Sequence, residues 1–202
     1  MARLTRSEVQ DRNRRMLLDV ARIAFLRDGY VATSLAAVAA AGGFTTGIVY
    51  SSFGSKADLA MQVATELQEE QIAALGEHLT ASDRHQLVQQ AKIWARSASE
   101  SGWIRFELEL LLDSIGDLRL AAAQVVRQQH AVAQITQIIG ALVPAAVLDE
   151  DAIEVVAETI VDYSIGVGIR QTTNPAATPE RFISMIEPMI IAVLDGVPAP
   201  TT

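Results

Sequence analysis

The chain has 202 residues, 50% of them hydrophobic, and carries a formal net charge of −8. It contains no cysteine, which excludes disulfides, thiolate metal sites and cysteine nucleophiles. Its apolar runs are far shorter than the ~18 residues of a membrane span, and no signal-peptide core follows the basic start "MARLTRSEVQDRNRR". We therefore expect a cytoplasmic protein without a membrane partner, built from one large domain or from a small domain fused to a larger one.

Charge is distributed unevenly along the chain. Residues 1–60 contain eight Lys/Arg and five Asp/Glu, a net charge of +3, whereas the remainder contains eight basic and nineteen acidic residues, a net charge of −11. Because a partner responds to the local field, a basic N-terminal segment on an acidic body is compatible with a nucleic-acid partner. A chance gathering of solvated arginines would give the same asymmetry.

The first predicted helix begins near Thr5 or Ser7, each of which opens a capping box. It ends at Gly29, where we expect a left-handed C-cap. Its apolar residues recur at the spacing of one buried helical stripe: Leu17, Val20, Ala21, Ala24 and Phe25.

Two short helices follow. Residues 33–34 (Thr-Ser) are good N-caps for the apolar run "LAAVAAAG", which the pair Gly42-Gly43 ends. Residues 45–46 (Thr-Thr) cap a second short helix that runs to about Phe53 and ends at Gly54.

Beyond these, helical periodicity continues without strand alternation, so the fold class is all-α. The expected helices span residues 56–79, 83–99, 103–113, 118–142, 149–171 and 179–195.

The two short helices, joined through a glycine-containing turn, have the form of a helix-turn-helix at about residues 34–53. The second helix would enter the DNA major groove, where small side chains allow close approach and hydroxyls bond bases or phosphates. We expect Phe53 to pack inward, Tyr50 to reach a phosphate and Lys56 to add a cation at the start of the next helix. A plain three-helix subdomain with solvated Tyr50 and Lys56 is the alternative. The predicted DNA-binding residues are Thr33, Ser34, Thr45, Thr46, Gly47, Tyr50, Ser51 and Lys56.

The stretch "LLDVARIAFLRDGYVATSLAAVAAAGGFTTGIVYSSFGSKADL" resembles the N-terminal part of the tetracycline-repressor (TetR) family of transcriptional regulators. The matching residues, in order and without gaps, are Phe25, Gly29-Tyr30, Thr33-Ser34, Gly43, Gly47, Tyr50, Phe53, Lys56 and Leu59. The resemblance implies an all-helical homodimer that binds a palindromic operator. It also implies a DNA-binding head at residues 1–60 and a ligand-binding and dimerisation body at residues 61–202.

The chain departs from the family pattern at several positions. Position 42 is Gly where the family favours Ala, and Phe44 replaces a smaller aliphatic residue. Thr46 and Ser52 stand where basic residues or histidine are common. These departures remove positive charge from the DNA-binding face, so DNA affinity would depend on the N-terminal residues Arg3 and Arg6.

No pattern of catalytic or metal-binding residues stands out. The three histidines do not have metal-ligand spacing, and Glu107 and Glu109 lie two apart on a helix and face different ways. We therefore expect no cofactor, no metal and no enzymatic activity. Core packing explains the aromatic residues of the body, and an apolar effector cavity is the functional alternative. Its candidate residues are Trp94, Trp103, Phe106, His130 and Tyr163.

The last two helices are expected to pair with their symmetry mates in a four-helix interface, although internal packing alone could also use their apolar stripes. The predicted interface residues are Ile153, Ile160, Ser164, Gly168, Ile186, Met189 and Ile190. We thus expect a ligand-released repressor with an unknown small-molecule effector. An activator on the same scaffold and a helical carrier or enzyme with a vestigial head are the alternatives.

Overall fold

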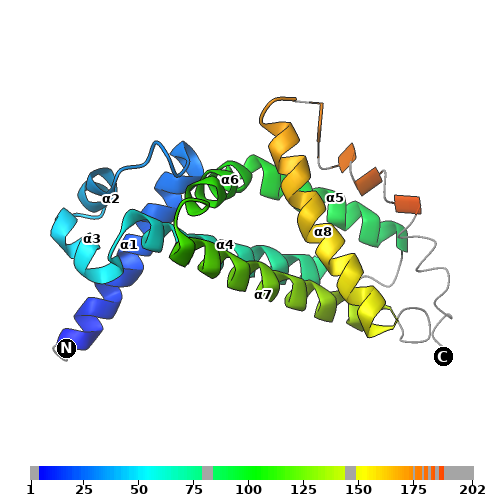
Figure 1. The fold of residues 1–202 in the computed structure, drawn as a ribbon, viewed down its shortest axis with the longest axis horizontal. Coiled ribbons are helices and arrows are strands. Elements are labelled where there is room, and N and C mark those ends of the chain that lie inside the picture. The colour runs from blue at the N-terminus through cyan, green and yellow to red at the C-terminus, as the bar shows by residue number, and fades with distance from the viewer. Residues whose placement is uncertain are drawn as a thin grey trace. The chain divides into compact units, whose positions relative to one another are not determined.

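The structure, a computed structural model, describes residues 5–78, 84–143, 149–174, 176–178, 180–181, 183–184 and 187–188. The described part contains no strand, so the predicted all-α class is confirmed. Its helices are drawn in Figure 1: α1 (Arg6–Asp28), α2 (Leu35–Ala41), α3 (Thr46–Phe53), α4 (Lys56–His78), α5 (Arg84–Glu100), α6 (Trp103–Ser114), α7 (Leu118–Leu142) and α8 (Glu150–Gln171).

Side chains at the helix starts explain these bounds. Thr5 and Glu8 form a complete capping box at α1, as predicted. Ser55 accepts from the Asp58 N–H at 3.0 Å and donates to the Asp58 carboxylate at 2.7 Å, which fixes the start of α4. Asp149 accepts from the Ala152 N–H at 2.9 Å in the same way at α8.

The chain divides into two compact units. The first unit comprises Met1–Leu67 and Arg105–Gln124, and the second unit comprises Gln68–Ile104 and Val125–Thr202. Therefore α6 from Arg105 onward and the start of α7 belong to the same unit as α1, α2 and α3. The functional boundary near residue 60 stays a prediction.

The core of the first unit is centred on two phenylalanine rings. Phe25 of α1 and Phe106 of α6 are both fully buried, and their rings stack with centroids 4.9 Å apart. Leu17, Val38 and Val49 are likewise fully buried and come from α1, α2 and α3. Burying such side chains contributes roughly 1.5–3 kcal/mol each, so α6 is an integral part of this core.

The second unit has two smaller clusters. One joins α4, α7 and α8 through Ile72, Ala131, Ile135 and Ala157. The other joins α5 to Ile183 through Val88 and Ala95.

One predicted cap needs correction. Gly29 has φ 85° and ψ 172°, a positive φ with an extended ψ, and not the left-handed helical conformation that we expected. This region is open essentially to glycine alone. The extended ψ directs the chain towards α6, and a Cβ atom at Gly29 would lie 2.6 Å from the Glu109 carboxylate.

No single described helix is long and apolar enough to cross a membrane, while α2 and α3, bent by 108°, pass that test only as a pair. The expected helix at 179–195 lies largely outside the described residues, apart from short helical stretches between 180 and 188. Three of the predicted interface residues also lie outside the described residues: Ile186, Met189 and Ile190.

Candidate nucleic-acid interface

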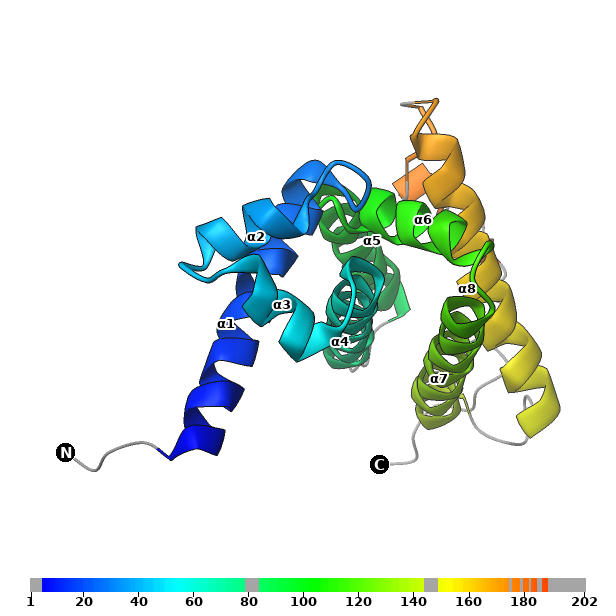
Figure 2. The ribbon, with the colours of Figure 1, turned by 60° about the vertical axis from the view of Figure 1, so that its left-hand side comes forward.

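The α2–turn–α3 segment has the geometry of a helix-turn-helix. The two helices meet at 108° (Figure 2), within the ~90–120° typical of this motif. Gly43 has φ 72° in the turn, and the Phe44 N–H donates to the Ala39 carbonyl at 2.8 Å. A Cβ atom at Gly42 would lie 2.8 Å from the Phe44 ring, so the two departures from the family pattern depend on each other.

One face of α3 is buried and the opposite face is open. Val49 is fully buried and Phe53 is 9% exposed, which fixes the inward side. Tyr50 is 54% exposed, and Thr45, Gly47 and Ser51 are exposed beside it. The N-cap Thr45 makes no side-chain capping bond, so its hydroxyl is not committed to the helix start. Thr46 is half-buried.

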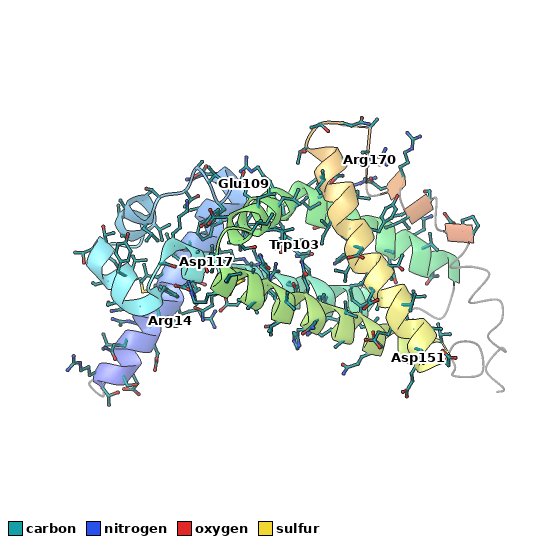
Figure 3. All side chains as sticks on the ribbon, viewed as in Figure 1. Arg14, Trp103, Glu109, Asp117, Asp151 and Arg170 are labelled. Atoms are coloured by element: carbon teal, nitrogen blue, oxygen red, sulfur yellow. The ribbon has the colours of Figure 1, made fainter. Side chains whose placement is uncertain are left out.

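Arg14 of α1 anchors the C-terminal end of α3 (Figure 3). Its guanidinium donates to the Ser52 carbonyl and, at 2.5 Å, to Oε1 of Gln62, and it lies 4.3 Å from the Phe53 ring centroid. The arginine therefore stabilises the α3 orientation and is not a free surface charge. This role could not be predicted from local sequence patterns, because the contacts join residues 38 and 48 positions apart.

Lys56 is held against the loop between α1 and α2. Its Nζ donates to the Val31 carbonyl at 3.2 Å and lies 4.3 Å from the centroid of the Tyr30 ring. Burial lowers the pKa of Lys56, although the nearby charges of Asp113 and Glu109 oppose this shift. The ammonium group has three protons, so these contacts leave donor capacity for a phosphate.

Two acidic residues of α6 hold the same loop from the other side. The Tyr30 hydroxyl donates to Asp113 Oδ2 at 2.5 Å, and the Val31 N–H donates to Glu109 Oε2 at 2.7 Å. Burial, followed by the bond to Asp113, raises the pKa of the Tyr30 hydroxyl. Figure 3 shows Glu109 on α6, beside the end of α1. Arg105 adds a bond to the Arg27 carbonyl at 2.7 Å.

Thr33 and Ser34 have structural bonds in this loop. Thr33 is 4% exposed, and its hydroxyl donates to the Gly29 carbonyl at 2.7 Å. Ser34 accepts from the Ala37 N–H at 3.1 Å as the N-cap of α2, yet it is exposed and can still donate. Of the N-terminal arginines, Arg6 is exposed at the start of α1, and Arg3 lies outside the described residues.

Comparison with known proteins agrees with this geometry. The family model described as "Bacterial regulatory proteins, tetR family" matches residues 17–63, which contain the helix-turn-helix and Lys56. The N-terminal part of the chain is therefore similar to the DNA-binding part of TetR-family regulators. The predicted resemblance is thereby confirmed, and so is the coarse function of a DNA-binding regulator.

Solved structures, among them one described as a TetR-family transcriptional regulator, share the fold over nearly the whole chain. A regulator from Pectobacterium atrosepticum has a TM-score of 0.69 at 21% identity, covering 98% of this chain and 100% of its own. GusR from Salmonella enterica has a TM-score of 0.66 at 18% identity, covering 96% and 100%. The SmeT–triclosan complex has a TM-score of 0.62 at 21% identity, covering 95% and 96%. A search of curated proteins found no significant match.

The predicted effector residues of this chain do not all lie in one unit. Phe106 belongs to the core of the first unit, whereas the other four belong to the second. Trp94 donates from Nε1 to the Gln71 carbonyl at 2.9 Å, and His130 is exposed. Trp103 Nε1 is buried without a hydrogen-bond partner, and Tyr163 is half-buried. Within the described residues, no group of three acidic or histidine side chains could hold a metal.

The predicted interface residues on α8 differ in their exposure. Ile153 and Gly168 are buried, and Ile160 packs against the α4–α7–α8 cluster. Ser164 is exposed and donates to the Ile160 carbonyl at 2.7 Å. Val156, on the apolar stripe predicted for this helix, is 38% exposed. Two further exposed apolar side chains on α8 were not predicted: Val155 and Ile169, which are 60% and 53% exposed.

Proposed function

We propose that this chain is a ligand-released repressor that binds a palindromic operator as a homodimer. The observation that carries the proposal is the outward face of α3, where Thr45, Gly47, Tyr50 and Ser51 are exposed while Val49 is fully buried. A recognition helix with small side chains approaches base edges closely. Tyr50 and Lys56 flank this face and can contact phosphates on either side of the groove.

Dimerisation follows from the way such a head reads DNA. Two heads would occupy successive major-groove turns ~34–36 Å apart, and a palindrome matches a two-fold symmetric protein. The exposed apolar residues of α8 support a second copy as the partner, because Val155 and Ile169 otherwise face water. Gly166 lies on the same helix, is exposed and would admit a side chain without contact, so another helix can approach there.

The second unit supports a small-molecule effector. Among its described residues, four polar atoms are buried without a hydrogen-bond partner: Gln90 Oε1, Trp103 Nε1, Gln134 Oε1 and Thr136 Oγ1. Such an atom costs about 1–3 kcal/mol, so a molecule that satisfies even one of them stabilises the unit. The related SmeT was solved with triclosan, and a comparable uncharged molecule would suit these uncharged groups. A coupling of ~1–3 kcal/mol would weaken operator binding roughly 5–150-fold.

The test is a selection of bound sequences from a random DNA pool with the full-length protein. We expect enrichment of a palindrome whose half-sites are separated by about one helical turn. Thr46→Ala and Ser51→Ala should each relax base preference at one or two positions, because a good base contact discriminates by ~1–3 kcal/mol. A pool that shows no enriched sequence would contradict the proposed function and favour a carrier or enzyme.

A further inference from the structure

The loop between α1 and α2 links α6 to Lys56 through two adjacent residues. Tyr30 donates its hydroxyl to Asp113 and places its ring under the Lys56 ammonium. Val31 donates its N–H to Glu109 and accepts from Lys56 at its carbonyl. Each of the two residues therefore bonds an acid of α6 on one side and Lys56 on the other.

The same loop leads directly into the helix-turn-helix. Two residues after Val31, Thr33 bonds back to the Gly29 carbonyl, and Ser34 caps α2. Gly29 itself has a backbone conformation that few other residues adopt, and a Cβ atom at this position would lie 2.6 Å from the Glu109 carboxylate. The loop thus has little freedom to move independently of α6.

We propose that Glu109 and Asp113 are positioning residues for DNA binding: they fix the Tyr30–Val31 turn, which in turn seats Lys56 for a phosphate. This inference rests on the proposed DNA-binding function and adds two acidic residues to it. Neither lies in the segment that matches the family model, residues 17–63.

The direction in which DNA affinity changes distinguishes this positioning role from direct repulsion between the carboxylates and the phosphates. A carboxylate near a DNA-binding surface repels phosphates, so its removal alone would raise DNA affinity. Loss of the positioning contacts would lower affinity instead, because Lys56 would no longer be held at the phosphate. The two explanations predict opposite changes.

The experiment measures affinity of the full-length protein for its selected operator at several salt concentrations. The variants are Glu109→Ala, Asp113→Ala and Tyr30→Phe, of which the last keeps the ring under Lys56 and removes only the bond to Asp113. The matched control is Asp19→Ala, which removes one negative charge from an exposed position on α1. Circular dichroism and thermal unfolding establish that each variant is folded.

We expect Glu109→Ala and Asp113→Ala each to weaken operator binding about 3–10-fold, while Asp19→Ala leaves it unchanged or slightly stronger. In the double variant Glu109→Ala/Asp113→Ala, the slope of log affinity against log salt should fall by about 0.9, the value for one lost phosphate contact. Adding the two changes to Lys56→Ala should then have no further effect, because the contact that they position is already gone.

Higher operator affinity in the α6 variants would overturn the inference, and so would lower affinity with an unchanged salt slope. If Glu109→Ala or Asp113→Ala fails to fold, Tyr30→Phe decides, and wild-type affinity and slope in that variant contradict the Asp113 role. Failure of the wild-type protein to bind any DNA would instead reject the proposed function, before the variants are compared.

Discussion

The two units differ in the size of their buried apolar cores and in the polar atoms that lie beside those cores. In the first unit, Phe25 and Phe106 stack in a fully buried core, and the buried hydroxyl of Thr33 bonds two backbone carbonyls. In the second unit, two small clusters share the interior with the unpartnered atoms of Gln90, Trp103, Gln134 and Thr136. The first unit is thus held by one large aromatic core, whereas the second unit has smaller clusters and is suited to gain stability from a bound molecule.

The largest effect expected from this comparison is loss of the aromatic stack in the first unit. Phe106→Ala should lower the free energy of unfolding by roughly 3–5 kcal/mol, because it leaves a cavity beside Phe25. Leu112→Ala on the same helix is the control: it is 67% exposed and should change stability by less than ~0.5 kcal/mol.

Urea unfolding followed by two signals tests this prediction. Circular dichroism reports on both units. Tryptophan emission, read in a Trp103→Phe background because Trp103 is the first residue of α6, reports on the second unit through Trp94. The helical signal of Phe106→Ala should shift more than the tryptophan signal. Equal shifts would show that the units unfold together and would weaken the comparison.

A matched pair of Thr→Val changes, one in each unit, should alter folding stability by smaller amounts and in opposite directions. Thr33→Val removes a donor from the Gly29 and Ala24 carbonyls and should destabilise by about 0.5–1.5 kcal/mol. Thr136→Val removes a buried hydroxyl without a partner and should stabilise the ligand-free protein by up to about 1 kcal/mol. Differential scanning calorimetry checks both, and destabilisation by Thr136→Val would show that its hydroxyl is already satisfied.

The turn of the helix-turn-helix allows a comparable sign reversal within the first unit. Gly42→Ala should destabilise by about 1 kcal/mol because its Cβ would crowd the Phe44 ring. Gly42 has φ −86° and ψ −3°, which alanine adopts readily, so in a Phe44→Val background the same change should stabilise by ~0.5 kcal/mol. A double-mutant cycle of thermal unfolding measures this coupling, and additive effects would refute the dependence between the two positions.

The smallest expected effect is on the loss of folding stability at acidic pH. Desolvation alone would raise the pKa of the Asp58 carboxyl. The hydrogen bonds from Ser55 and Arg119 outweigh desolvation and lower this pKa below its ordinary value of 3.8. Because the folded pKa is depressed, this stabilisation is present above pH ~4 and is lost as pH falls through the folded pKa. Asp58→Asn should therefore flatten the loss of stability between about pH 4 and pH 2. An unchanged acid profile would mean that other carboxylates dominate.

Local signals in the sequence account for most helix bounds. A helix was predicted to begin at residue 56, and Gly54 was predicted to end the preceding helix after Phe53, as the structure has them. Each of these signals acts within one helical turn, so it can be read without knowledge of the fold.

The contacts of the α1–α2 loop could not be read in this way. Val31 and Glu109 are 78 residues apart, and Tyr30 and Asp113 are 83 apart, so periodicity and capping carry no information about their pairing. Residues 103–113 were assigned to the body because they follow residue 60 in the chain. In the structure, Phe106 of this segment instead packs on Phe25 of α1. The same distance in sequence explains why Gly29 was expected to be an ordinary C-cap.

The bond from the Val31 amide to Glu109 makes this single peptide group a potential reporter. An amide proton exchanges with solvent only when its hydrogen bond opens, and the exchange rate measures the free energy of that opening. Val31 itself is 71% exposed, so exchange needs only release of the carboxylate and no wider unfolding. Deuterium uptake at this one amide would thus follow the docking of α6 on the loop without any label attached to the protein.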